Sequence, residues 1–130
     1  MPKQSELQKR QEQVLVGDMQ VLSATGELFN HVDNELPMWA GDGDRKVSVE
    51  ISFKNAFAAP PAITLGLSGI DSAHDQNLRF WLSATNVSEQ GFTVTLQSWG
   101  DTHIARAAIS WTAFGAKGPY KIATTSAKPR

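Results

Sequence analysis

Seven acidic and imidazole side chains outside the predicted strands are the groups in this sequence most suited to chemistry. They are Asp42, Asp44, Asp71, Asp75, Asp101, His74 and His103. Hydrolysis would need paired carboxylates or an activated nucleophile, and no serine, histidine and aspartate stand in a recognisable catalytic pattern. Loop aspartates mostly form turns, because their carboxylates bond to nearby backbone groups. We therefore expect no enzymatic activity.

The same side chains form a poor metal site. His74 and Asp75 supply one imidazole beside scattered carboxylates, which is not a tetrahedral zinc set. Asp42-Gly43-Asp44 lacks the further oxygen ligands and the distal glutamate of a calcium loop. The chain has no cysteine, so thiolate ligands and disulfides are excluded. We expect neither a metal nor a cofactor.

Arg79 is the cation whose surroundings suggest binding. Apolar and polar residues alternate from Leu78 to Ala84, which predicts a strand with Arg79 in its middle, beside Trp81. A planar guanidinium beside aromatic surface suits sugar hydroxyls or a partner's carboxylate. A solvated salt bridge is the alternative interpretation.

Alternation of period two predicts the strands that must position these residues. The predicted strands span residues 14–22, 46–53, 62–70, 78–84, 92–97 and 104–114. The phase changes at Gly17-Asp18, which predicts a bulge or bend inside the first strand, and residues 24–43 read as a long surface loop. Six strands with short turns predict an all-β fold, an antiparallel sandwich or barrel.

The 130 residues fit one domain. We expect a polar N-terminal extension over residues 1–18, the domain over 19–115 and a flexible basic tail over 116–130. Ser5-Glu6-Leu7-Gln8 is a weak capping box, so the extension is either a mobile tail or a helix on an oligomer's surface. Residues 104–114 are apolar on both faces, which places that strand in the centre of a sheet or against a partner subunit.

Composition excludes several partners. With 12 basic and 13 acidic residues the net charge is -1, which gives no basis for binding nucleic acid or an anionic membrane. No apolar run has the length of a signal peptide core or a membrane span. We expect a cytoplasmic protein, or one exported without a signal peptide.

A set of weak markers in fixed order carries a family resemblance. The markers are Trp39, Arg45, Val47, Ile51, Phe53, Phe57, Pro60-Pro61, Asp71, Asn77-Leu78-Arg79, Val87, Gly91-Phe92, Trp99, Asp101-Thr102 and Ser110-Trp111. Over residues 20–114 the chain resembles the H-type lectin domain, the family of snail agglutinins and of the C-terminal domain of discoidins. The resemblance implies a six-stranded antiparallel sandwich that assembles into trimers, sometimes stacked as hexamers. It also implies binding of galactose-type sugars, typically N-acetylgalactosamine, near subunit interfaces.

The resemblance also implies which residues bind the sugar. The acidic residue of the family falls on Asp42, the arginine on Arg79 and the strand tryptophan on Trp99. Snail agglutinins have a histidine where this chain has Gly100, and an aromatic residue where it has Ala105.

Neighbouring side chains offer replacements for the two missing groups. Asp101, His103 and Arg106 are the candidates for compensation, and Asp101 joins the predicted site with Gly100. Trp39, Trp81 or Trp99 could stack on the sugar ring, although core or interface packing also explains each tryptophan.

Two hypotheses follow. The first is a lectin that uses several shallow sites on one assembly, as in cell adhesion. The second is a structural or attachment module that keeps the fold and has lost the sugar site, as the substitutions at Gly100 and Ala105 would suggest.

Overall fold

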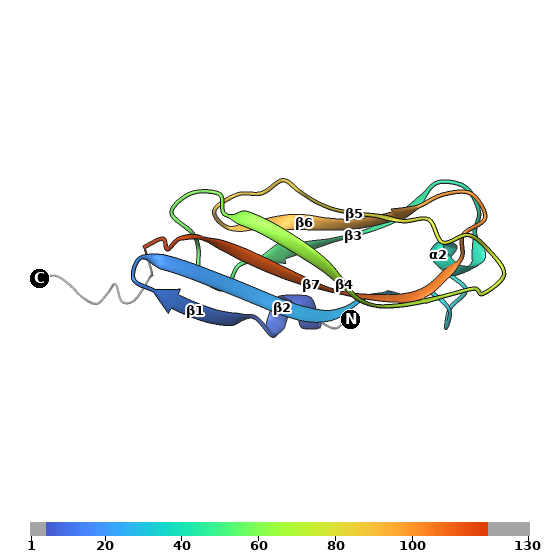
Figure 1. The fold of residues 1–130 in the computed structure, drawn as a ribbon, viewed down its shortest axis with the longest axis horizontal. Helices are drawn as coiled ribbons and strands as arrows, with labels where there is room; N and C mark the ends of the chain where they lie inside the picture. Colours follow the sequence, from blue (N-terminus) through green and yellow to red (C-terminus); the bar gives the residue numbers. More distant parts are fainter. Residues whose placement is uncertain (1–4, 120–130) are drawn as a thin grey trace, which may run out of the picture.

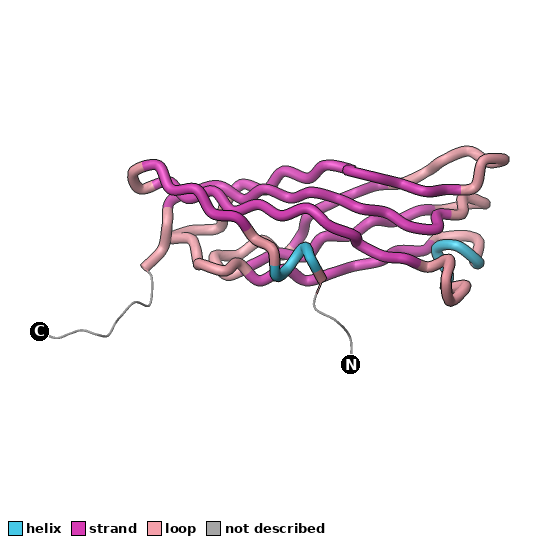
Figure 2. Tube along the Cα trace, turned by 90° about the horizontal axis from the view of Figure 1, so that it is seen from below, coloured by secondary structure: helices cyan, strands magenta, loops and turns pink. Residues whose placement is uncertain are grey.

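Two antiparallel sheets pack face to face in the computed structural model, which describes residues 5–119 (Figure 1). One sheet has the strand order β1-β2-β7-β4 and the other β3-β6-β5. The elements are α1 (Glu6–Lys9), β1 (Glu12–Val16), β2 (Met19–Asn30), α2 (Pro37–Ala40), β3 (Arg45–Ser52), β4 (Ala62–Ser72), β5 (Trp81–Thr85), β6 (Gly91–Ser98) and β7 (Ile104–Ala116). The strands run along the length of the molecule, with the short helices at its margins (Figure 2). The predicted all-β antiparallel sandwich is confirmed.

The core lies between the sheets because alternate residues of each strand point inward. In the four-stranded sheet, Leu22 and Ala113 face each other across β2 and β7 and both are buried. Trp111 of β7 meets Phe92 of the opposite sheet with ring centroids 5.4 Å apart and Phe53 with centroids 5.9 Å apart. Interleaved aromatic rings of this kind account for the close packing of the two sheets.

Strand β7 lies between β2 and β4, which explains its apolar sequence. The predicted central position is therefore confirmed within the described residues. Residues 106–114 pair on both sides, and Trp111 has Ala24 on one neighbour and Leu65 on the other. The predicted strands over 46–53, 62–70 and 92–97 also correspond to β3, β4 and β6.

The first predicted strand divides into a hairpin, which adds β1 to the six strands expected. Val16 pairs with Met19, so Gly17-Asp18 is a two-residue turn, and the predicted bend inside one strand is wrong. Gly17 has φ +57°, a conformation that hairpin turns require and that glycine adopts without steric cost.

The predicted long loop over residues 24–43 is also wrong. Strand β2 continues to Asn30 with a register shift between Glu27 and Phe29, and α2 follows at Pro37–Ala40. The shift moves the inward side chains from one alternation phase to the other, so a strict period of two ends there although the strand does not.

The N-terminal segment packs against the domain over residues 5–13, so the first of the two alternatives for it, a mobile tail, is wrong there. Ser5 caps α1 by accepting a hydrogen bond from the Leu7 amide, and the Leu7 side chain is fully buried. The Trp111 indole donates to the Leu7 carbonyl at 3.0 Å. The boundary of the domain at residue 19 stays a prediction.

Helix α1 and Gln11, which follows it, also bind the edge of the three-stranded sheet. The Gln8 side-chain amide accepts from the Ser52 amide at 2.8 Å and donates to the Ser52 carbonyl at 2.8 Å. Gln11 donates to the same carbonyl at 2.7 Å and accepts from the Lys54 amide at 2.9 Å. These side chains pair with backbone groups at the end of β3 and so link the two sheets.

At the other end of the chain, Lys117 pairs with Phe57 in an isolated bridge, so the described start of the predicted tail contacts the domain. The predicted tail over residues 120–130 lies outside the described residues. No helix between residues 5 and 119 is long and apolar enough to cross a membrane.

Truncation of Leu7 tests whether α1 belongs to the core. We expect Leu7→Ala to lower the free energy of unfolding by about 2–5 kcal/mol, because it removes a fully buried side chain and leaves a cavity. Urea unfolding followed by tryptophan fluorescence measures this change. The matched control is Leu15→Ala on the exposed β1 strand, for which we expect a change within about 0.5 kcal/mol. Equal effects of the two variants would show that α1 does not contribute to the core.

Candidate functional site

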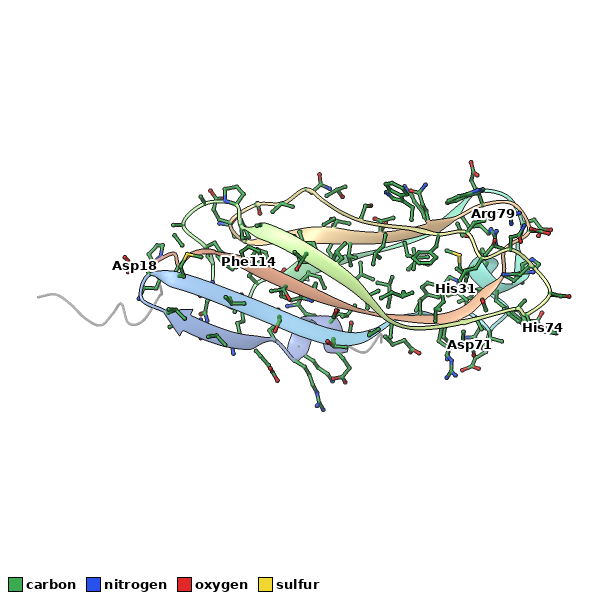
Figure 3. All side chains as sticks on the ribbon, in the orientation of Figure 1. Asp18, His31, Asp71, His74, Arg79 and Phe114 are labelled. Atoms are coloured by element: carbon green, nitrogen blue, oxygen red, sulfur yellow. The ribbon has the colours of Figure 1, made fainter. Side chains whose placement is uncertain are left out.

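The predicted site residues gather at the end of the sandwich that carries α2. Three connections meet there: residues 41–44 after α2, residues 73–80 between β4 and β5, and residues 99–103 between β6 and β7. Figure 3 shows Arg79 and His74 at this end and Asp18, in the β1–β2 turn, at the opposite end. All three connections are joined by hydrogen bonds through residues 99–103.

Thr102 anchors the 99–103 connection. Its side chain is fully buried, and its hydroxyl donates to the Asn77 carbonyl at 2.6 Å. The same oxygen accepts from the Arg79 amide at 3.2 Å and from Arg79 Nη1 at 3.0 Å. The buried Ser98 hydroxyl donates to the Arg79 carbonyl at 2.6 Å. Two buried hydroxyls therefore hold the backbone of Arg79 from both sides.

Gln76 holds the end of the same connection. Its side-chain amide accepts from the His103 amide at 2.6 Å and donates to the His103 carbonyl at 3.2 Å. The Gln76 amide bonds to both the N–H and the C=O of His103, as a residue of a neighbouring strand would. The backbone of His103 is therefore held in place just before β7 begins.

Arg45 organises the 41–44 connection from inside. Its guanidinium donates to the carbonyls of Gly41 at 2.7 Å and Gly100 at 3.1 Å, and its Nε donates to Gly43 at 2.8 Å. The Gly43 amide donates to the Gly100 carbonyl at 2.8 Å. Arg45 is thus a structural cation that satisfies backbone carbonyls of two connections.

Arg79 and Asp101 form the first of two open pairs. Arg79 Nη1 lies 2.7 Å from Asp101 Oδ1, and the side chains are 29% and 72% exposed. The hydrogen bond from Arg79 is the main cause that lowers the pKa of Asp101, followed by a backbone hydrogen bond and the charge of Arg79. Arg79 lies before β5 rather than within a strand, so its predicted mid-strand position is wrong. Its backbone bonds to Thr102 and Ser98 side chains instead of to a ladder.

Asp42 and His103 form the second pair. Asp42 Oδ1 lies 3.0 Å from His103 Nε2, and Asp42 is 75% exposed. The Trp39 ring meets the His103 ring edge-on, with centroids 6.4 Å apart. The partner of Asp42 is therefore His103, whereas Arg79 pairs with Asp101. Both pairs stand on the 99–103 connection.

Gly100 lies where the two pairs meet. It has φ +70°, a conformation that favours glycine, and a β-carbon there would lie 3.3 Å from Arg79 Nη1. Its carbonyl accepts from Arg45 and from the Gly43 amide. Glycine at this position is thus explained by backbone conformation and by the close guanidinium. A side chain in this place would strain the turn.

Three further candidates are not members of the two pairs. Ala105 is buried and offers no surface to a ligand. Arg106, a proposed substitute donor, pairs with Asp71 at 3.5 Å on the four-stranded sheet. Trp99 is partly exposed and faces a hollow on the three-stranded sheet. Between residues 5 and 119 no three His, Asp or Glu side chains lie close enough together to hold a metal ion.

Sequence reasoning missed how three residues act here. Arg45 and Thr102 are markers of the resemblance to which no role was assigned, and Gln76 is not among the candidate residues. Glycines on both sides of Asp42 indicate an irregular segment outside any strand. Its backbone carbonyls need a side-chain donor, and Arg45 is that donor. No local signal identifies Gln76, because its partner is 27 positions away.

His31 holds the start of α2, the helix that leads into the 41–44 connection. Its Nδ1 accepts from the Met38 amide in the first turn of α2 at 3.1 Å, and its ring lies against Phe29 with centroids 4.7 Å apart. Burial lowers the pKa of His31. The neutral ring is the form that can accept this hydrogen bond.

Comparison with known proteins yields a family match. The sequence model of the H-type lectin domain matches residues 48–114. A protein of Fuscovulum blasticum called "ATP synthase subunits region ORF 7" is 39% identical over 88 residues, which are 68% of this chain and 76% of that protein.

Two solved structures of discoidin II of Dictyostelium discoideum share the fold. Their TM-scores are 0.66 and 0.67, with 17% and 18% identity over 78% of this chain. The match spans only 39% and 38% of those chains. At this identity the similarity concerns the fold alone.

Removing the Thr102 hydroxyl tests the anchor of the site. We expect Thr102→Val to lower the free energy of unfolding by about 1–3 kcal/mol, because the Asn77 carbonyl and the Arg79 amide lose a buried partner. Chemical denaturation measures the loss. Thr112→Val, on the half-buried outward face of β7, removes the same hydroxyl where it bonds to no described backbone group, and should shift stability by at most about 0.5 kcal/mol. A Thr102 variant as stable as this control would contradict the anchoring role.

The lowered pKa of His31 predicts an acid-sensitive contact. Because the folded state favours the neutral ring, the stabilisation is complete above the ordinary value of 6.5 and is lost as pH falls through the lower folded pKa. We expect His31→Asn, which keeps an acceptor but does not titrate, to weaken the dependence of the melting temperature on pH between about 7.5 and 5. NMR titration of the His31 ring checks the direction of the shift. Identical pH profiles of the two proteins would contradict the assignment.

Proposed function

Because the chain belongs to the H-type lectin domain family, we propose that it is a lectin that binds galactose-type glycans, such as those ending in N-acetylgalactosamine, and performs no catalysis. The sugar site is the end of the sandwich formed by residues 41–44, 76–80 and 99–103. The proposed working form is a trimer or hexamer.

The single observation that carries this proposal is the arrangement of two donor–acceptor pairs at that end. Arg79–Asp101 and His103–Asp42 both stand on one short connection, with exposed carboxylates. Within the described residues, all side-chain hydrogen bonds of Arg79 use Nη1, so Nε and Nη2 remain for a ligand. Exposed carboxylates and donors held rigidly side by side suit a ligand rich in hydroxyl groups.

Recognition follows from the hydroxyl geometry of the ring. Galactose-type sugars present an equatorial 3-hydroxyl and an axial 4-hydroxyl on one edge. In our proposal Asp101 accepts from one hydroxyl while Arg79 donates to it, and Asp42 with His103 contacts the neighbouring group. An equatorial 4-hydroxyl would leave one of these groups without a partner, at a cost of about 1–3 kcal/mol.

The outward face of the four-stranded sheet supports assembly. Val14, Val16, Met19 and Phe114 are exposed on neighbouring strands at the end away from the site. An apolar patch of this kind suits a subunit interface. Several weak sites on one assembly would gain affinity for a multivalent surface through avidity.

A second candidate function is a structural or attachment module without sugar binding. Two observations favour it: Ala105 is buried where an aromatic residue would stack on the sugar, and each carboxylate of the site already has a partner. The two functions differ in whether the open pairs bind any glycan.

A glycan array with the labelled protein tests the proposal, with the mass in solution measured on the same sample. We expect selective binding to glycans ending in galactose or N-acetylgalactosamine. Asp101→Asn and Arg79→Gln should weaken binding about ten- to a hundredfold, because each removes a charge-assisted hydrogen bond.

The matched control is Asp71→Asn, which breaks an exposed Asp–Arg pair on the other sheet and should leave sugar binding intact. An oligomer that binds no glycan on the array would favour the structural module. Binding that survives both site variants would place the sugar elsewhere.

A further inference from the structure

The outward face of the three-stranded sheet carries an aromatic side chain that the packing does not use. Trp81 is 64% exposed at the start of β5, while the next residue, Leu82, packs against the core. The strand register places Trp81 beside Gln97 of β6, and Gln97 beside Lys46 of β3. Cross-strand partners point to the same side of a sheet, so these three side chains form one row.

A hollow lies next to this row. It has a volume of about 440 Å³ and is lined by Asp44, Arg45, Lys46, Gln97, Ser98 and Trp99. Trp99 follows Gln97 by two positions, directly after the end of β6, and lines the hollow. The row and the hollow thus share Lys46 and Gln97, with Trp81 in the row and Trp99 in the lining of the hollow.

The hollow adjoins the site described above. Arg45 lines the hollow and donates to the Gly100 carbonyl, and Trp99 directly precedes Gly100. Gly100 in turn lies against the Arg79 guanidinium. A ligand that leaves the Arg79–Asp101 pair toward β6 would therefore enter the hollow.

We propose that Trp81, Gln97 and Lys46, together with the hollow beside Trp99, form a second sugar subsite. It binds a further ring of a glycan whose terminal residue occupies the Arg79–Asp101 end. This inference rests on the proposed lectin function and adds to it a preference for oligosaccharides over single sugars.

The chemistry of the face matches a saccharide. Indole rings pack against the C–H face of a pyranose, while an amide, an ammonium group and a carboxylate bond to its hydroxyls. No ion pair among residues 5–119 involves Lys46, so its ammonium group is available to a ligand. The next rows of the face carry Ser48, Thr95, Ser83, Glu50, Thr93 and Thr85. A face of hydroxyl and charged groups around one indole offers a protein partner little apolar area.

Calorimetric titration of Trp81→Ala with saccharides of two lengths tests the subsite. The probes are methyl galactoside, which fills only the terminal site, and a galactose-terminated tetrasaccharide, which can also reach the proposed subsite. We expect the wild-type protein to bind the tetrasaccharide more tightly, and Trp81→Ala to lose about three- to tenfold of that affinity. Methyl galactoside affinity should not change. Trp81→Phe, which keeps an aromatic face, should restore most of the loss, and Thr85→Ala on the same strand face serves as the control.

The outcomes separate this inference from the proposed function. If methyl galactoside binds and Trp81→Ala leaves the tetrasaccharide affinity unchanged, the subsite is overturned while the lectin function stands. If neither probe binds any variant, both fail. If Trp81→Ala changes the mass in solution, or iodide cannot quench Trp81 in the wild-type assembly, this face is a subunit contact and the subsite is overturned.

Discussion

A fully buried hydroxyl cannot stay without partners, and this constraint on Thr102 shapes the candidate site. Its oxygen contacts the backbone of Asn77 and both the backbone and the side chain of Arg79. These contacts join the connection before β5 to the connection before β7. Because desolvated polar groups cost free energy when unpaired, the two connections hold one geometry rather than several. Asp101 and His103 flank Thr102 in the chain, so their positions follow from the same contacts.

Two arginines at this end of the sandwich show how one residue type serves different needs. Arg45 turns its guanidinium toward the backbone carbonyls of Gly41, Gly43 and Gly100, and so replaces the hydrogen bonds that an irregular segment lacks. Arg79 uses one nitrogen for internal contacts and leaves the rest of its fork at the surface. The first cation supports the connection, and the second is available to a ligand.

Gly100 removes a side chain from the site end of the sandwich, but the Arg79 guanidinium lies close to it. In the snail agglutinins that this chain resembles, the corresponding residue is a histidine. Here φ is +70°, and a β-carbon would lie 3.3 Å from Nη1 of Arg79. An imidazole is still present at His103, three positions along the chain and paired with Asp42. In this chain the imidazole at this end of the sandwich is therefore supplied from the residue just before β7.

The sequence by itself determined an antiparallel all-β fold, because a period of two in residues 46–53 and 92–97 depends only on which side chains face the core. The strand pattern left sandwich and barrel open, and the family resemblance indicated the sandwich. It also indicated Asp42, Arg79 and Asp101 as polar residues of one family pattern. The continuation of β2 was hidden, because a register shift at Glu27 breaks the alternation without ending the strand. The pairing of Asp42 with His103, the burial of Leu7 under Trp111 and the row of Trp81, Gln97 and Lys46 were decided only by the tertiary structure. Their partners stand far apart in the chain, and spacing along one chain carries no information on which strands lie side by side.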